Sequence, residues 1–155
     1  MNTGLLISLL ILPFLLMAQN REHPVNETAL GYNKVVELNF EQALSKLKTE
    51  LKKEGFGVLT EVDIKDTFKK KLDVDFRPYQ ILGVCNPQLA RRSILAEEEI
   101  GLMLPCKFIV YVNKQNKTVI AAVDPVKTMA VLDNKKLAEA AELVQLKFKK
   151  VMDSL

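Results

Sequence analysis

The two cysteines of the chain are the residues whose type and position best suggest chemistry. Cys85 stands in the segment Gly83-Val84-Cys85-Asn86-Pro87, and Cys106 ends the segment Leu104-Pro105-Cys106. The pattern predicts that Cys85 ends one strand and that Cys106 starts the next. Two thiols at such positions can have a structural role, as a disulfide or as two packed thiols, can line a ligand or cofactor site, or can take part in thiol–disulfide exchange.

The sequence leaves these three uses of the cysteines open. If the two strands are antiparallel neighbours, the Cα atoms could approach the roughly 4.4–6.8 Å that a disulfide requires. Cys85 also precedes a predicted helix, and the N-terminus of a helix favours a thiolate. There is no Cys-x-x-Cys spacing, however, and the sequence does not fix the register that decides whether the two side chains share a face.

Two further corners of the chain combine a helix cap with a proline, Asn86-Pro87 and Asp124-Pro125. Asn and Asp are favoured caps, and proline suits the first position of a helix. Both corners lie at predicted strand-to-helix junctions. If the junctions meet at one end of the sheet, Asn86 and Asp124 would present polar groups to a small cavity; simple helix capping is the alternative.

Several classes of active site are excluded by composition. The single histidine, His23, precedes the predicted folded domain, so a Ser-His-Asp arrangement is excluded. There is no glycine-rich phosphate loop, and two isolated cysteines do not provide the four ligands of a typical zinc site. We therefore predict no catalytic residue, no metal and no cofactor. The net charge of +3 and the absence of tryptophan also argue against nucleic acid as a partner.

The first residues resemble a secretion signal. An almost purely apolar run of 13 residues extends from Leu5 to Met17, which is within the range of a signal peptide and short of the roughly 20 residues of a spanning helix. Ala18 can precede the cleavage site, giving a mature start near Gln19. We expect a signal peptide at 1–18 and an extracytoplasmic protein, periplasmic or secreted, where two thiols tend to oxidise. An uncleaved anchor, the only expected membrane contact, and a buried segment are the alternatives.

The rest of the chain predicts a linker at 19–32 and a single α+β domain at 33–155. Alternating and β-branched segments predict five strands, at 33–39, 57–64, 79–85, 104–113 and 118–124. Helical spacing predicts a helix capped by Asn39, helices at 65–72 and 88–98, a helical turn after Asp124-Pro125 and a long helix from Asn134. The expected architecture has two layers, with a mostly antiparallel five-stranded sheet and long helices packed on one face.

These motifs resemble a known family. Residues Pro78 to Ala90, followed by Ile100 to Cys106, resemble the core signature of the domain of unknown function 302 family, small α+β proteins with Cys-Asn-Pro and Leu-Pro-Cys motifs. The resemblance extends over about 35–155. It implies a TATA-binding-protein-like fold, without implying DNA binding, and it makes a homodimer plausible. Arg91 stands where members often have His or Tyr, which argues against a His-dependent metal or haem role.

The resemblance and the motifs together give the functional expectation. We expect an exported, non-enzymatic binding or interaction domain, homodimeric, with an unknown small-molecule ligand near the two cysteines. The alternative is a thiol-redox enzyme or sensor that uses the same two cysteines. Cys85 and Cys106 are also the candidate disulfide. The family pattern and the corner motifs mark as ligand-binding candidates Tyr79, Cys85, Asn86, Pro87, Pro105, Cys106 and Asp124.

Overall fold

The computed structural model describes residues 23–155, so the predicted signal peptide and the first residues of the predicted linker lie outside the described residues. No helix within residues 23–155 has the length and apolar character needed to cross a membrane. The elements, in chain order, are β1 (Asn26–Glu27), β2 (Gly31–Val36), α1 (Phe40–Lys53), β3 (Gly57–Asp63), α2 (Ile64–Leu72), β4 (Tyr79–Cys85), α3 (Pro87–Ala96), the 3-10 helix η1 (Glu98–Met103), β5 (Cys106–Val112), β6 (Thr118–Val123), α4 (Pro125–Met129) and α5 (Lys135–Asp153).

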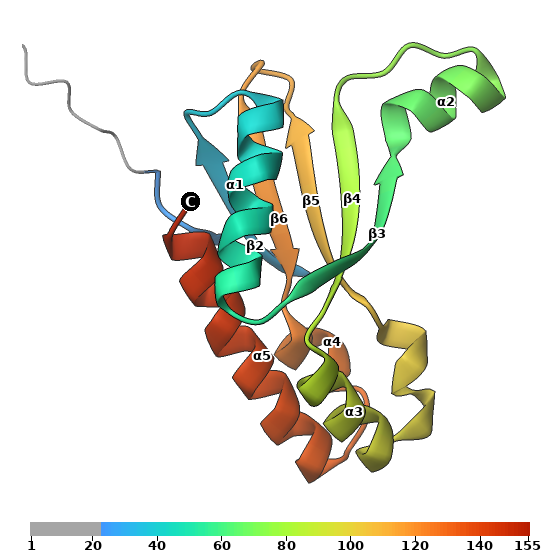
Figure 1. The fold of residues 1–155 in the computed structure, drawn as a ribbon, viewed down its shortest axis with the longest axis vertical. Helices are drawn as coiled ribbons and strands as arrows, with labels where there is room; N and C mark the ends of the chain where they lie inside the picture. Colours follow the sequence, from blue (N-terminus) through green and yellow to red (C-terminus); the bar gives the residue numbers. More distant parts are fainter. Residues whose placement is uncertain (1–22) are drawn as a thin grey trace, which may run out of the picture.

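The strands form one antiparallel sheet in the order β1-β2-β6-β5-β4-β3 (Figure 1). The α+β class and the antiparallel sheet are confirmed, but the prediction of five strands is wrong, since the sheet has six. The additional strand, β1, lies in the predicted linker. Its two residues are both exposed, so they lack the apolar alternation that identifies a strand. A turn places β1 beside β2, with the Thr28 amide donating to the Gly31 carbonyl.

Helices α1 and α5 pack on one face of the sheet and form the main core (Figure 1). The predicted long helix is α5, and it carries an apolar stripe whose members are all buried: Leu137, Ala140, Ala141, Val144, Phe148 and Val151. Phe148 lies between Phe56 and Phe108, with ring centroids 4.9 and 4.8 Å away. Burial of apolar side chains of this size contributes roughly 1.5–3 kcal/mol each, so this contact between α5 and the sheet is a principal source of stability.

A buried lysine fixes the end of α5 against the sheet. Lys34 of β2 is only 6% exposed, and its ammonium donates to the carbonyl oxygens of Met152 and Asp153 at 3.3 and 3.4 Å. The last carbonyls of a helix have no partner within it and carry partial negative charge. Lys34 therefore satisfies these groups and holds the C-terminus of α5 beside β2.

The segment between β4 and β5 differs in detail from the prediction. The predicted helix at 88–98 corresponds to α3, which ends at Ala96; the 3-10 helix η1 that follows was not predicted, and β5 begins at Cys106 rather than at residue 104. Glu97 adopts an extended conformation with φ of −155°, which ends α3 and starts the tighter turn. Pro105 has no amide hydrogen to donate to the sheet, so the strand starts after it.

Helix α2 extends away from the body of the molecule (Figure 1). Asp63 caps it, as its side chain accepts a hydrogen bond from the Asp66 amide at 2.9 Å. None of its residues is buried. The helix therefore adds little to the core and projects from the edge of the sheet formed by β3 and β4.

Candidate functional site

The two cysteines meet at one end of the sheet, where β4 and β5 stop. The strands are antiparallel neighbours, as the disulfide hypothesis requires, and Cys106 pairs with Val84. Cys85 is one position further along β4, so its Cα is roughly 6 Å from that of Cys106. Side chains alternate along a strand, and so Cys85 leaves the backbone in a different direction from Val84 and Cys106. A disulfide would need the end of β4 to turn.

Close packing of glycine and proline sets this end of the sheet. A Cβ atom built on Gly83 would lie 2.2 Å from Thr60 Oγ1 and 2.7 Å from Pro105 Cγ. Only glycine leaves room for both neighbours, because a separation below 3 Å is a clash. Gly83 thereby allows the ring of Pro105 to pack over β4 just before Cys106, which accounts for the glycine and the proline in the two motifs.

Asn86 connects β4 to α3. Its side-chain oxygen accepts a hydrogen bond from the Leu89 amide at 3.2 Å, and its backbone carbonyl accepts one from the Ala90 amide at 2.9 Å. Pro87 follows in the first turn, where its missing amide hydrogen costs nothing. The predicted capping role of Asn86 is therefore confirmed, and the cap directs α3 across the end of the sheet.

A small cavity lies between this end of the sheet and the helices. Its volume is about 20 Å³, which is room for about one water molecule. Among the described residues, those that line it are uncharged: Phe56, Val84, Cys85, Asn86, Leu89, Ala90, Ser93, Leu104, Cys106, Met129, Ala140, Ala141 and Val144. The Ser93 hydroxyl donates to the Leu89 carbonyl at 3.0 Å, so the surface of the cavity is mainly apolar.

The cavity owes part of its lining to residues that the sequence analysis did not select. Ala140 and Ala141 belong to the buried stripe of α5, and Met129 ends α4. Two adjacent alanines in a stripe of larger residues are a signal for close approach of another element, since they leave space beside the helix. The sequence signal was present, but it did not say which element approaches.

Both cysteines are free thiols. Cys106 is 7% exposed, and its burial, with the neighbouring Cys85 as a smaller cause, raises the pKa of its thiol to about 11. Cys85 is partly exposed, and burial raises the pKa of its thiol as well. Because the thiolate is the reactive form, neither cysteine is activated as a nucleophile at neutral pH.

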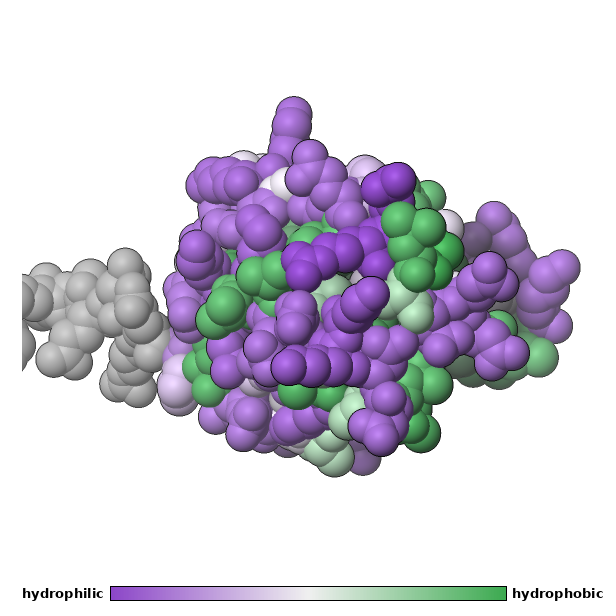
Figure 2. Space-filling model, turned by 90° about the horizontal axis from the view of Figure 1, so that it is seen from below, coloured by the Kyte–Doolittle hydropathy of each residue, from purple (hydrophilic) through white to green (hydrophobic). Residues whose placement is uncertain are grey.

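The end of the molecule that carries the cavity is formed by α3, η1, α4 and the start of α5. Seen from that end, the surface is predominantly hydrophilic, with separate hydrophobic patches (Figure 2). Three apolar side chains are largely exposed there, Leu95, Leu102 and Val131, at 70%, 87% and 81%. These residues belong to three different segments, so their exposure identifies no continuous apolar surface.

Four of the seven predicted ligand residues do not line the cavity. Tyr79 begins β4 and is six residues from Cys85, a distance of roughly 20 Å along a strand. Its ring instead stacks on Tyr111, with centroids 5.5 Å apart. Asp124 is at the start of α4, and its carboxylate takes part in a separate network. Pro87 and Pro105 flank the two cysteine segments and shape the cavity indirectly.

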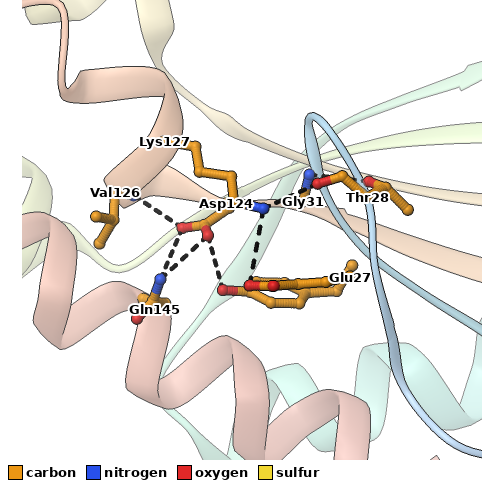
Figure 3. A network of polar contacts seen from close by, with 8 residues as sticks. Glu27, Thr28, Gly31, Asp124, Val126, Lys127 and Gln145 are labelled. Atoms are coloured by element: carbon orange, nitrogen blue, oxygen red, sulfur yellow. Dashed lines mark hydrogen bonds and ion pairs between the residues drawn. The ribbon is translucent and has the colours of Figure 1, made fainter.

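Asp124 holds three elements together (Figure 3). Its carboxylate accepts hydrogen bonds from the Tyr32 hydroxyl of β2 at 2.7 Å, from Gln145 Nε2 of α5 at 3.0 and 3.1 Å, and from the Val126 amide of α4 at 3.0 Å. It is 1% exposed. Burial alone would raise the pKa of Asp124, but these hydrogen bonds and one from the Lys127 backbone lower it below its ordinary value.

Tyr32 and Gln145 are the partners that sequence reasoning missed. Burial, together with the hydrogen bond to the Asp124 carboxylate and its charge, raises the pKa of the Tyr32 hydroxyl above its ordinary value. Gln145 follows Val144 of the buried stripe on α5, and a polar residue beside such a stripe is a weak signal of a buried hydrogen bond. Both carboxylate oxygens of Asp124 accept hydrogen bonds from other parts of the fold. The arrangement therefore has a structural role and is not a binding site.

Comparison with known proteins gives a family and one solved relative. A family model described as "Domain of unknown function DUF302" matches residues 32–155. The fold is similar to the crystal structure of an uncharacterized conserved DUF302 protein from Bacillus stearothermophilus, with a TM-score of 0.76 and 30% sequence identity. That match covers 82% of this chain and 98% of the other. A search of curated proteins found no match.

Proposed function

Because the chain belongs to the DUF302 family, whose description assigns no activity, we propose its function from the geometry of the site. The protein is a small, non-enzymatic binding domain that holds an uncharged, largely apolar ligand between the end of the sheet and helices α3 and α5. The observation that carries this proposal is the cavity that Cys85 and Cys106 line together.

The chemistry of the lining supports an uncharged ligand. In the described part of the chain, the residues around the cavity offer apolar carbon, two protonated thiols, the Asn86 amide and the Ser93 hydroxyl, and no charged group. A charged ligand would lose its hydration here without an opposite charge in return, which costs several kcal/mol. A neutral ligand would lose little, and it would gain contacts with Leu89, Leu104 and Met129.

The size of the cavity supports a site that opens when the ligand enters. At about 20 Å³, it admits no organic molecule without movement. Helix α3 is the element best able to move, since Ser93 is its one buried residue and segments with few buried contacts open at low free-energy cost. A small outward displacement of α3 would enlarge the cavity from the side of Leu89 and Ala90.

Benzene is a suitable probe for this proposal, since the full chain can be titrated with it and followed by amide NMR. We expect shifts concentrated at Leu89, Ala90 and Cys106. In an Ala90→Leu variant the larger side chain fills the cavity, and these shifts should disappear. Ala138→Leu is the matched control, because Ala138 is exposed on α5 and does not line the cavity. Shifts that persist unchanged in Ala90→Leu would refute the site.

A thiol-redox role is the second candidate. It is supported by the closeness of two cysteines of unequal exposure, with the accessible Cys85 beside the buried Cys106. The raised pKa of both thiols favours the binding role. Equilibration of the full chain with glutathione redox buffers, read by mass after alkylation, separates the two. A reversible Cys85–Cys106 disulfide at moderately oxidising potentials would favour the redox role.

We also propose that the protein is exported. The apolar run from Leu5 to Met17 supports secretion to an extracytoplasmic compartment, and Edman sequencing of the protein recovered from that compartment should start near Gln19. Recovery of the chain from the cytoplasm with Met1 intact would refute export.

The two-layer arrangement of α1 and α5 on one side of the sheet supports the TATA-binding-protein-like architecture.

A further inference from the structure

The face of the sheet opposite α1 and α5 is apolar although no helix of residues 23–155 covers its centre. Alternation places one set of side chains from β2, β6, β5 and β4 on that face. The register pairs Val35 with Val119, Tyr111 with Val119, Ile109 with both Ala121 and Ile81, and Tyr79 with Tyr111. An antiparallel sheet with one face in water normally shows polar residues there. This sheet instead has the pattern of one that is buried on both faces.

Charge is nearly absent from this open face. Among the described residues of the five longer strands whose side chains lie on it, the one charged group is Lys107, at the end of β5. Its ammonium donates to the carbonyl of Pro105, just before the start of β5. The remaining polar members are Asn33 and Thr60, also toward the edges. A continuous apolar surface of this kind marks an interface.

An aromatic row extends the open face toward α2. The Tyr79 ring is 6.4 Å from Phe76, and Phe76 is 5.2 Å from Phe68 of α2, measured between centroids. Arg77 lies over the Phe76 ring at 4.9 Å. Because α2 has no buried residue, this row is the main contact that attaches the helix to the sheet.

We propose that the open face is the interface of a homodimer, in which two copies of the chain pack sheet against sheet. The area is suitable. Four strands about 4.8 Å apart and six residues long give a flat area on the order of 400 Å², and side-chain relief and the aromatic row add to it. The flat part alone is about half of the roughly 800 Å² that each partner contributes to a stable complex, and the aromatic row and side-chain relief extend it.

The charge pattern is compatible with a second copy and argues against a charged partner. In a two-fold dimer the same patch faces itself, so any net charge on it would repel its copy. A patch with a single ammonium at its edge meets this condition. An acidic or basic partner, or an anionic membrane, would be matched by a charged surface instead. Two sheets that pack in this way lie about 10 Å apart, which lets Ile81 and Ile109 contact their counterparts. This inference does not depend on the cavity at the cysteines.

Sedimentation velocity and light scattering of the full chain test the proposal. We expect twice the mass of one chain for the unaltered protein, and the mass of one chain for an Ile109→Lys variant, which places a charge at the centre of the face. Leu102→Lys is the matched control, since Leu102 is 87% exposed on η1, and its mass should stay doubled. Circular dichroism establishes that each variant is folded.

If Ile109→Lys does not fold, Ala121→Lys on the neighbouring strand gives the same measurement with a smaller change in volume. A monomeric unaltered protein at micromolar concentration and above would overturn the proposal. So would a dimer that survives both lysine substitutions, because another surface would then hold it together. Association with a different protein in place of a second copy would appear as the monomeric outcome.

Discussion

Removal of one hydroxyl from the Asp124 network should destabilise the protein measurably. Tyr32→Phe deletes the donor that lies 2.7 Å from Asp124 Oδ2, and both side chains are at most 4% exposed. A hydrogen bond to a buried charged group contributes about 1.5–3 kcal/mol. Gln145 and Val126 still donate to the carboxylate in the variant, so its charge is not left without partners. We expect a loss of about 2 kcal/mol in the free energy of unfolding.

The assay is urea denaturation of the full chain, with thermal unfolding as a second measurement. A loss of this size should lower the melting temperature by roughly 5–10 °C in a domain of this length. Tyr111→Phe is the control, because it deletes a hydroxyl from a partly exposed ring of the open face. A change in Tyr32→Phe no larger than in the control, below about 0.5 kcal/mol, would refute the reasoning.

The pH dependence gives an independent test of the same hydrogen bond. The pKa of Tyr32 is raised in the folded state from the value of about 10 expected in the unfolded chain. Above pH 10 the unfolded chain therefore releases a proton that the folded chain keeps, and stability falls as the pH rises. The raised pKa of Tyr32 contributes its full amount to the free energy of unfolding below pH 10, and this contribution is lost as the pH rises above 10. Tyr32→Phe lacks this group, so the stability difference between the two proteins should narrow above pH 10.

Three further outcomes follow from the structure. Gly83→Ala should cost about 1–3 kcal/mol in urea denaturation, because the added methyl group has no space; unchanged stability would show that the neighbours relax. Lys34→Met should cost about 1–3 kcal/mol in the free energy of unfolding, because the carbonyls of the last α5 turn lose their partner. Amide hydrogen exchange near residue 152 should become faster. The prediction is wrong if these amides already exchange without protection in the unaltered protein. Iodoacetamide should modify Cys85 before Cys106, and both slowly at neutral pH with rates that rise with pH; rapid modification at pH 7 would contradict the raised pKa values.

Local signals made much of the fold predictable. The capping box of Asn39 and Gln42 forms as the sequence indicates, with both reciprocal hydrogen bonds present. The cap at Asn134 also forms, through a bond to the Leu137 amide. These features depend on residues three positions apart, so the chain can satisfy them before any tertiary contact exists. The apolar stripes on α1 and α5 are also readable from local spacing, although their burial requires the sheet.

Features that depend on distant residues were not predictable. Strand β1 becomes a strand because β2 offers it a free edge, and its own two residues carry no pattern. Tyr32 and Asp124 are 92 positions apart, and no periodicity connects them. The interpretation of Asp124 as a ligand residue assumed that both cap-plus-proline corners enclose one cavity. Instead, the carboxylate of Asp124 is already occupied by Tyr32 and Gln145.

The cysteine motifs gain a geometric explanation from this comparison. Pro105 has no amide hydrogen to donate to β4, and Asn86 caps α3 instead of continuing the strand. The pairing of β4 with β5 therefore stops at Val84 and Cys106. The two thiols consequently lie where the sheet gives way to helices. Each of these residues has a structural reason to be what it is, except for the thiols, since alanine or serine would fill similar space. A functional experiment should therefore begin with Cys85 and Cys106, because their replacement changes the lining of the cavity directly.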